Sequence, residues 1–242
     1  MRVPRIYHDS SLVCDTEIML NEDAANHVGR VLRLGEGHAL ELFCGDNHIY
    51  KGVITQASKK HVAVNIVEKT LQDVESPLKV HLVQGISRGD RMDFTLQKSV
   101  ELGVASITPI FTERCGVKLQ GERLQKKRQQ WQKIVIAACE QSGRNCVPEV
   151  CEPMTLDAYL AQAERPQTLT LEPSAQHSLK SAPINRELAL LIGPEGGFSP
   201  AEVERTHAAQ CMPVRLGPRV LRTETAALTA LAALQANHGD LI

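Results

Sequence analysis

The spacing of apolar and polar positions changes near residue 72 of this 242-residue chain. Before that point, short runs with apolar residues at alternate positions predict β-strands, and residues 22–34 carry the spacing of a helix that ends at Gly35. The predicted strands are residues 5–7, 38–43, 48–55 and 61–67. Several short strands with one helix predict a small β-barrel.

Residues 72–77 are polar and end in Pro77, so we expect a linker there and two domains, 1–72 and 73–242. After the linker, strand patterns alternate with helix patterns, which predicts an α/β fold whose parallel sheet carries helices on both faces. The expected strands are residues 79–85, 106–111, 168–171, 187–192 and 213–216. The expected helices are residues 91–102, 121–142, 156–163 and 223–237, with another that a Ser199–Glu202 capping box begins.

The composition is that of an ordinary soluble protein, with 43% hydrophobic and 23% charged residues. The apolar runs are too short to cross a bilayer and the N-terminus lacks a signal-peptide core, so we expect a cytoplasmic protein with no membrane partner. The seven cysteines form no CxxC pair and the nine histidines show no ligand spacing. We therefore expect no metal site.

A local basic stripe interrupts an otherwise balanced charge distribution with a net charge of −1. Its members are Arg114, Lys118, Arg123, Lys126, Lys127, Arg128 and Lys133, and only Glu122 opposes them. A solvated helix face is the simpler explanation when the stripe is considered alone. Docking on a phosphate backbone is the alternative.

Two predicted strand-to-helix loops contain glycine together with charged residues. The first is Gly193-Pro194-Glu195-Gly196-Gly197 and the second comprises residues 216–226, with Arg222 and Glu224. Ligands of open parallel sheets bind beyond the carboxyl ends of the strands, where both loops lie. Neither loop has the dinucleotide or P-loop pattern. Each alone could be a tight turn, with Arg222 paired to Glu195 or Glu224, but together they indicate a nucleotide-like ligand.

The same two loops resemble the cofactor loops of SPOUT-type RNA methyltransferases. Over essentially its whole length the chain is similar to the RsmE family, which methylates N3 of a uridine in 16S ribosomal RNA. Further segments that carry the resemblance are residues 27–33, 88–93, 97–104 and 137–144. The Gly193–Phe198 and Leu216–Ala226 sequences together are highly specific for this family.

The resemblance implies S-adenosylmethionine as cofactor and 16S ribosomal RNA of the 30S subunit as substrate. It implies a deep trefoil knot in the C-terminal SPOUT domain and a PUA-like N-terminal barrel that binds RNA. A homodimer would place each active site at the interface. Two alternatives remain open: a methyltransferase for another RNA base, and an RNA-binding protein without catalysis.

Site residues follow from the resemblance and from the chemistry of uracil. N3 is a poor nucleophile until it loses its proton, so we expect Arg222 to stabilise charge on a uracil oxygen. Glu195 or Glu224 would accept the proton or orient Arg222. The expected cofactor contacts are Leu171, Glu172, Ile192, Gly193, Pro194, Glu195, Gly196, Gly197, Leu216, Gly217, Val220, Leu221, Arg222, Thr223, Thr225 and Ala226. The expected RNA contacts are Arg5, Arg30, Arg33, Arg88, Arg91, Lys118, Lys126 and Lys127.

The final helix also needs a residue at its start that satisfies the first free N–H groups. Thr223 and Thr225 both precede an alanine-rich helical run, and a threonine hydroxyl can accept from those groups. We therefore expect one of these two threonines to cap the helix. Glu224 would lie favourably near its positive end.

Overall fold

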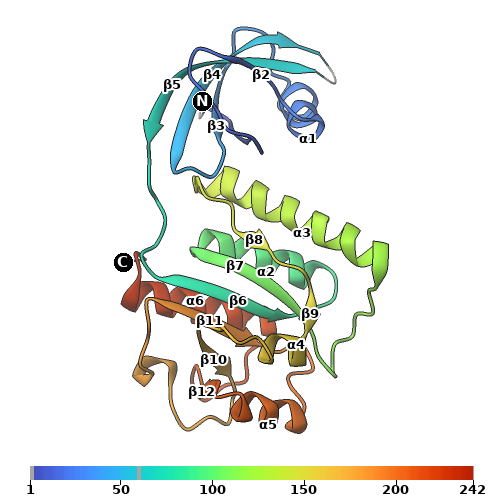
Figure 1. The fold of residues 1–242 in the computed structure, drawn as a ribbon, viewed down its shortest axis with the longest axis vertical. Helices are drawn as coiled ribbons and strands as arrows, with labels where there is room; N and C mark the ends of the chain where they lie inside the picture. The colour runs from blue at the N-terminus through green and yellow to red at the C-terminus, as the bar shows by residue number, and fades with distance from the viewer. Residues whose placement is uncertain (1–2, 59–60, 242) are drawn as a thin grey trace. The chain divides into compact units, whose positions relative to one another are not determined.

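The structure, a computed structural model, describes residues 3–58 and 61–241 and divides them into two compact units (Figure 1). The first unit contains the described residues up to Glu75 together with Cys139–Val147, and the second contains Ser76–Ala138 and the chain from Pro148 onward. The boundary therefore lies between Glu75 and Ser76 rather than after residue 72. The segment Cys139–Val147, which we expected in the second domain, belongs to the first unit.

The described residues of the first unit form a five-stranded sheet in the order β1-β3-β4-β5-β2. β1 runs parallel to β3, and the other pairs are antiparallel. The alternating side chains that point inward, such as Leu40, Leu42 and Val64, build one hydrophobic core. The strands are β1 (Arg5–Tyr7), β2 (Glu17–Met19), β3 (Ala39–Phe43), β4 (His48–Ala57) and β5 (Val62–Leu71). Since β1 and β2 are at the two ends of this order, closure into a barrel stays a prediction.

The helix expected over residues 22–34 is shorter and irregular. Asn21 caps α1 (Glu22–Asn26), since its side chain accepts from the Ala24 N–H at 2.9 Å. A π-helical turn, His27–Val31, follows. Arg33 then has a left-handed φ of 57°. The helical path therefore ends at Arg33, before Gly35, and the predicted end was wrong.

In the second unit, the described strands form a parallel sheet in the order β12-β10-β11-β6-β7-β8, with β9 paired to β7. The predicted parallel sheet is confirmed. Its strands are β6 (Lys79–Gly85), β7 (Val104–Phe111), β8 (Glu149–Val150), β9 (Met154–Thr155), β10 (Gln167–Leu171), β11 (Glu187–Ile192) and β12 (Met212–Val214). Its helices are α2 (Asp90–Glu101), α3 (Gly121–Ser142), α4 (Leu156–Leu160), α5 (Pro200–Ala208) and α6 (Thr223–His238).

Helices cover both faces of this sheet. Val83 of β6 packs in one cluster with Leu156 and Tyr159 of α4. Gln84, the next residue, points to the opposite face because side chains alternate along a strand, and its amide bonds Thr223 at the start of α6. α4 and α6 therefore lie on opposite faces. No described helix is both long and apolar enough to cross a membrane.

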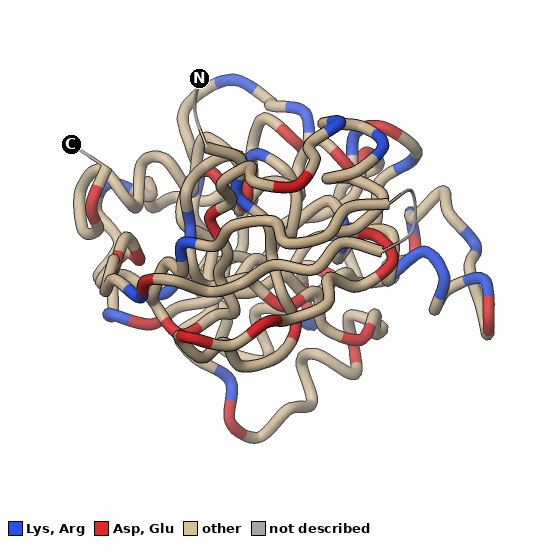
Figure 2. The backbone as a smooth tube through the Cα atoms, turned by 90° about the horizontal axis from the view of Figure 1, so that it is seen from above, with Lys and Arg blue, Asp and Glu red and all other residues tan. Residues whose placement is uncertain are grey.

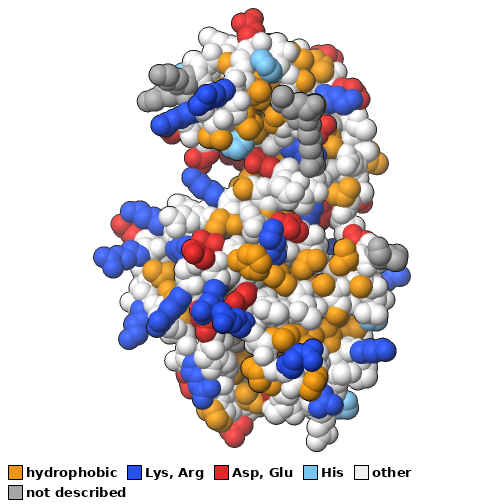
Figure 3. Space-filling model, turned by 180° about the vertical axis from the view of Figure 1, so that it is seen from behind, with side chains coloured by type: hydrophobic (Ala, Val, Ile, Leu, Met, Phe, Trp, Pro, Cys, Tyr) orange, Lys and Arg blue, Asp and Glu red, His pale blue; other side chains and the backbone are white. Residues whose placement is uncertain are grey.

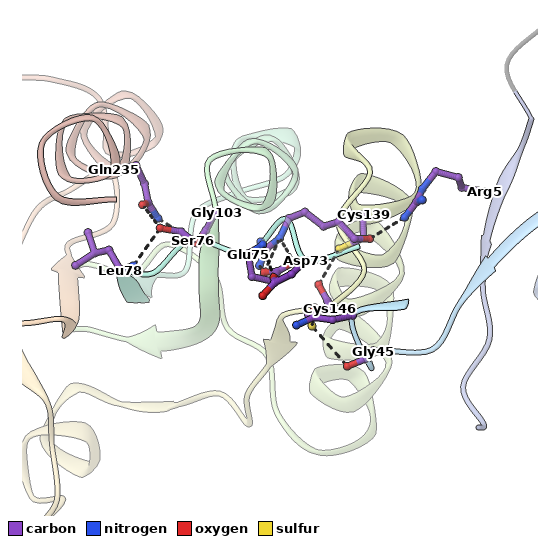
Figure 4. Close-up of polar contacts among 12 residues, drawn as sticks. Arg5, Gly45, Asp73, Glu75, Ser76, Leu78, Gly103, Cys139, Cys146 and Gln235 are labelled. Carbon is purple, nitrogen blue, oxygen red and sulfur yellow. Dashed lines mark hydrogen bonds and ion pairs between the residues drawn. The ribbon is translucent and has the colours of Figure 1, made fainter. Parts of the chain in front are cut away.

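The two residues at the boundary between the units are held by different partners. Glu75 forms an ion pair with Arg144 of the first unit. The Ser76 hydroxyl donates to Oε1 of the buried Gln235 at 2.6 Å, and the Gln235 Nε2 donates to the Gly103 carbonyl at 3.2 Å (Figure 4). Glu75 and Ser76, two residues of the expected linker, are therefore each fixed by side-chain contacts.

Candidate functional site

The segments that follow β6, β7 and β11 meet at one edge of the sheet, since parallel strands share the edge at which their carboxyl ends lie. The Arg88 N–H, after β6, donates to the Glu195 Oε1 at 2.9 Å. The Arg114 Nη1, after β7, donates to the Gly196 carbonyl at 3.1 Å. Both partners belong to the glycine loop after β11, so the segments after β6 and β7 each hold it by one hydrogen bond.

The glycine loop lies directly on the end of β6. A Cβ atom at Gly85 would be 2.6 Å from Pro194 Cδ and 2.7 Å from the Gly193 carbonyl carbon, which leaves no room for a side chain. Within the loop, the Gly197 N–H donates to the Pro194 carbonyl at 2.9 Å, and Gly197 has a φ of 64°. The loop is therefore a tight turn that needs glycine at Gly197 for the positive φ, and its close contact with β6 needs glycine at Gly85.

A cavity of about 940 Å³ opens between the two glycine-bearing loops. Of the residues expected to hold the cofactor, only Thr225 lies outside its lining; that residue is exposed on the first turn of α6. Arg222, Glu195 and Glu224, expected to act in catalysis, line it too. Contact of these residues with a cofactor stays a prediction.

A further wall of the cavity comes from α5 and from the segment after β10, and of its residues the sequence suggested only Glu172. Glu172 accepts hydrogen bonds there, from the Ser174 hydroxyl at 2.6 Å and from His207 Nε2 at 3.0 Å. Ser174 is two positions from Glu172, but His207 is 35 positions away, so no local motif connects α5 to this segment. The further lining residues are Arg91, Pro173, Phe198, Pro200, Val203, Glu204, Val214, Arg215 and Arg219.

The start of α6 departs from the expected threonine cap. The N-cap residue is Arg222, and its side chain makes no capping hydrogen bond. The Thr223 hydroxyl donates instead to the Gly193 carbonyl at 2.6 Å, which ties the second loop to the first. The expectation that Thr223 or Thr225 caps this helix was therefore wrong. The predicted capping box of α5 is confirmed, with the Glu202 N–H donating to the Ser199 hydroxyl oxygen at 3.1 Å.

The three candidate catalytic side chains have different surroundings. Glu195 forms an ion pair with Arg91, with 3.3 Å between Oε1 and Nη1. The exposed Arg222 guanidinium has no hydrogen-bond or ion-pair partner within residues 3–58 and 61–241, so it pairs with neither glutamate of the loops. Glu224 Oε2 is buried without a hydrogen-bond partner in the described chain.

Glu195 is expected to titrate below an ordinary glutamate. Partial burial favours its neutral acid, but the Arg88 N–H and the Arg91 guanidinium bind the carboxylate and hold the pKa of Glu195 below its ordinary value of 4.5. Its contribution to stability is therefore present above the pKa of the unfolded chain and lost as the pH falls through the lower folded pKa. A carboxyl ¹³C NMR titration, assigned with Glu195→Gln, measures this midpoint. A midpoint at or above 4.5 would contradict the two hydrogen bonds.

Arg5 does not fit its expected role as an RNA contact. It is only 7% exposed, and its guanidinium donates to the Arg144 carbonyl and to Asn145 Oδ1 at 3.1 and 2.8 Å. It also lies over the Phe43 ring. These contacts give Arg5 a structural role inside the first unit.

The basic stripe is partly neutralised by neighbours. Lys127 pairs with Asp93, and Arg128 with Glu149 and Glu152. Lys and Arg positions are interspersed with Asp and Glu along most of the backbone (Figure 2). Of the other expected RNA contacts, those with exposed side chains are Arg30, Arg33, Arg88, Arg91, Lys118 and Lys126.

Gln84 is a residue of this region that the sequence reasoning missed. It is fully buried at the end of β6 and bonds Thr223 of the second loop. The available signal was a single amide side chain in the otherwise apolar end of a strand, directly before Gly85. Such an amide is costly to bury unless it has a structural or functional task.

Comparison with known proteins places this geometry in a family. The RNA methyltransferase domain family matches residues 74–235, and the RNA methyltransferase PUA domain family matches residues 20–67. The ribosomal RNA small subunit methyltransferase E of Buchnera aphidicola subsp. Schizaphis graminum is 39% identical, covering 99% of this chain and 98% of the relative. That of Bacillus subtilis is 34% identical over 88% of this chain and 87% of the relative.

Solved structures agree. The Neisseria gonorrhoeae ribosomal RNA small subunit methyltransferase E bound to S-adenosylmethionine superposes with a TM-score of 0.95 at 39% identity, over 100% of both chains. A Legionella pneumophila protein, solved with its bound cofactor SAM, superposes with a TM-score of 0.96 at 47% identity, again over 100% of both chains. This chain belongs to the ribosomal RNA small subunit methyltransferase E family.

Proposed function

We propose that the chain transfers a methyl group from S-adenosylmethionine to ribosomal RNA of the small subunit, at N3 of one uridine in 16S RNA. The observation that carries the proposal is the cavity between the Gly193–Gly197 and 216–226 loops, in a chain whose relatives are solved with this cofactor. The RNA substrate follows from the family, and the assembled 30S subunit is the form of it that we propose.

The residues around the cavity suit the chemical groups of S-adenosylmethionine. The start of α6 has no side-chain cap, so its first N–H groups can bind a carboxylate. The unpartnered Glu224 Oε2 suits a positive charge or an N–H donor. Glu172, already fixed by Ser174 and His207, suits ribose hydroxyl groups. The backbone N–H and carbonyl groups of the loops can bind the adenine.

Bound S-adenosylmethionine supplies an electrophilic methyl group, and the protein mainly has to position the acceptor nitrogen. Arg222 lines the cavity with an unpaired guanidinium, which suits stabilisation of negative charge on a uracil oxygen. Glu195 is held by Arg88 and Arg91, and its lowered pKa makes it a weak base. We therefore assign Glu195 to orientation of the loop and Glu224 to acceptance of the N3 proton.

The rim of the cavity favours an anionic substrate. Arg215, Arg219 and Arg222 line it with exposed side chains, and none of them has an ion-pair partner in the described part of the chain. On the face of the second unit seen in Figure 3, apolar side chains lie exposed between Lys and Arg side chains. Cations beside apolar surface suit phosphates and an unstacked base. N3 is on the Watson–Crick edge, so the target uridine has to be unpaired or flipped out.

A trefoil knot and a homodimer are part of the proposal. β12 joins the sheet beside β10, and the chain then returns to the centre, where Thr223 bonds Gly193. This return of the chain to the earlier loop is the observation that supports a knot. Val220 lines the cavity and is 82% exposed, so its side chain is accessible to a second copy. A second copy that covers Val220 would complete the site.

The test measures binding and reaction separately. We expect isothermal titration calorimetry to show one S-adenosylhomocysteine site per chain. We also expect transfer of tritiated methyl groups to 30S subunits from a strain without the enzyme, with mass spectrometry placing the group on uracil N3. Subunits from a strain that has the enzyme serve as the control and should accept none. Absence of binding would favour a non-catalytic RNA-binding protein, and methylation elsewhere would favour another base.

A further inference from the structure

We propose that Gln84 is a positioning residue that locks the two cofactor loops together through a directed hydrogen-bond relay, Gln84 to Thr223 to Gly193. Gln84 is not among the described residues that line the cavity, whereas Thr223 and Gly193 are. It therefore acts through them. This inference rests on the proposed function insofar as it names the cofactor, but the relay itself is a property of the ligand-free protein.

The burial of Gln84 calls for an explanation. Its side chain is 0% exposed at the carboxyl end of β6, on the face that also carries the buried Val80 and Leu82. An apolar residue would fit such a strand at no cost, whereas an amide loses its hydration and has to recover it through hydrogen bonds. The hydrogen bonds that the amide makes are what offsets the cost of its burial.

The hydrogen bonds define one direction of donation. Gln84 Nε2 donates to the Gly85 carbonyl at 3.0 Å and to Thr223 Oγ1 at 2.9 Å. The Thr223 hydroxyl has a single hydrogen, which it donates to the Gly193 carbonyl at 2.6 Å. Rotating the amide by 180° would set its oxygen against the Gly85 carbonyl oxygen. The donor end of the amide must therefore face Thr223.

Two polar groups of the relay do not stabilise the strand or the helix in which they lie. Gln84 Oε1 is buried without a hydrogen-bond partner in residues 3–58 and 61–241. Thr223 is the first residue of α6, and its hydroxyl bonds the Gly193 carbonyl without capping the helix. Both polar groups instead serve the link between the loops. Their arrangement fixes the position of Gly193 relative to α6.

The relay fixes the distance between two walls of the cavity. Gly193 begins the first loop, and Thr223 is the first residue of α6 in the second loop. β6 supports both, because Gln84 holds Thr223 and Gly85 lies under Pro194. Without the relay, the two loops are no longer held at a fixed distance from each other. Cofactor binding then has to order them, which weakens the apparent affinity.

The first experiment removes the donor while keeping the size of the side chain. In Gln84→Met, we expect hydrogen–deuterium exchange of the ligand-free protein to be about tenfold faster in residues 193–198 and 216–223, as loss of one net hydrogen bond implies. We expect the calorimetric Kd for S-adenosylhomocysteine to rise by about the same factor. The KM for S-adenosylmethionine should rise, with kcat at saturation changing much less.

The second experiment tests the middle of the relay and protects against a misfolded Gln84 variant. Thr223→Val keeps the branched shape without the hydroxyl and should reproduce the faster exchange, whereas Thr223→Ser keeps the hydroxyl and should restore protection. Loop exchange in the double variant Gln84→Met/Thr223→Val should be no faster than in the single variant with the larger effect, because both substitutions interrupt the same hydrogen-bond relay.

Gln167→Met is the matched control. Gln167 is the first residue of β10, which β11 separates from β6, and its side chain bonds the Pro183 carbonyl and the Asn185 N–H at 2.7 and 2.9 Å. Gln167→Met should leave the exchange of both loops and the Kd for S-adenosylhomocysteine unchanged. Native loop exchange in either Gln84→Met or Thr223→Val, or equal effects of Thr223→Ser and Thr223→Val, would overturn the relay. If wild-type protein bound no S-adenosylhomocysteine, the proposed function would fail while the exchange result still decided the relay.

Discussion

Replacing Arg222 with alanine is expected to lower the rate of methyl transfer to ribosomal RNA by about a hundredfold or more at saturating cofactor, the usual effect of losing one group that stabilises developing charge. Its guanidinium lines the cavity and is exposed, and the described residues offer it no internal partner. The folded state therefore loses little when it is removed. A tritiated-methyl assay on 30S subunits gives the rate, and calorimetry should show the affinity for S-adenosylhomocysteine within a few-fold of wild type.

Arg219 provides the matched control for this prediction. It belongs to the same loop, lines the same cavity and is likewise exposed and without an ion-pair partner in the described chain. If position matters as well as charge, Arg219→Ala should mainly weaken RNA binding and retain most of the maximal rate. Near-native turnover in Arg222→Ala, or equal losses in the two variants, would exclude a specific role for Arg222.

Replacing Gly85 with alanine is expected to lower the affinity for S-adenosylhomocysteine by about a hundredfold and to destabilise the protein by about 1–3 kcal/mol, the range for an overpacked site. The added methyl group would meet the Pro194 ring at 2.6 Å and the Gly193 carbonyl carbon at 2.7 Å. Neither obstacle is a flexible side chain that could rotate away. The glycine loop therefore has to move off β6, which changes the cavity that it lines. Calorimetry and thermal denaturation measure the two effects.

Gly35→Ala is the control, since a Cβ atom there meets no described heavy atom within 4 Å. It should leave both the melting temperature and the affinity unchanged. If Gly85→Ala also bound S-adenosylhomocysteine normally, the contact between β6 and the glycine loop would not be needed for the shape of the cavity.

The elements that the sequence predicted well are those whose signal is local. β11 is a run of apolar residues buried on both sides, and its bounds Glu187–Ile192 match the prediction. The start of α5 is equally local, because Ser199 and Glu202 satisfy each other's backbone N–H groups within one turn. β2, β8 and β9 have two or three residues each, too few to show a period, and were missed, although the equally short β1 was predicted.

The errors arise where a distant contact outweighs a local preference. The helix over residues 22–34 became π-helical next to Gly29, whose missing Cβ would lie 2.9 Å from the Ser58 carbonyl oxygen. Thr223 has the local preference of a helix cap, but Gly193 and Gln84 take its hydroxyl instead. Arg5 has the charge of an RNA contact, yet partners more than a hundred residues away bury it.

The sequence by itself determined the order of the elements, the parallel sheet of the second unit and the two loops of Gly193–Gly197 and 216–226, because periodicity, caps and glycine act over a few residues. Only the tertiary structure decided that these loops enclose one cavity, that Arg222 is left unpaired while Arg91 takes Glu195, and that Gln84 joins the loops from beneath. Those outcomes depend on which side chains of distant segments meet, and hydrogen bonds between residues 30 to 139 positions apart leave no period in the sequence.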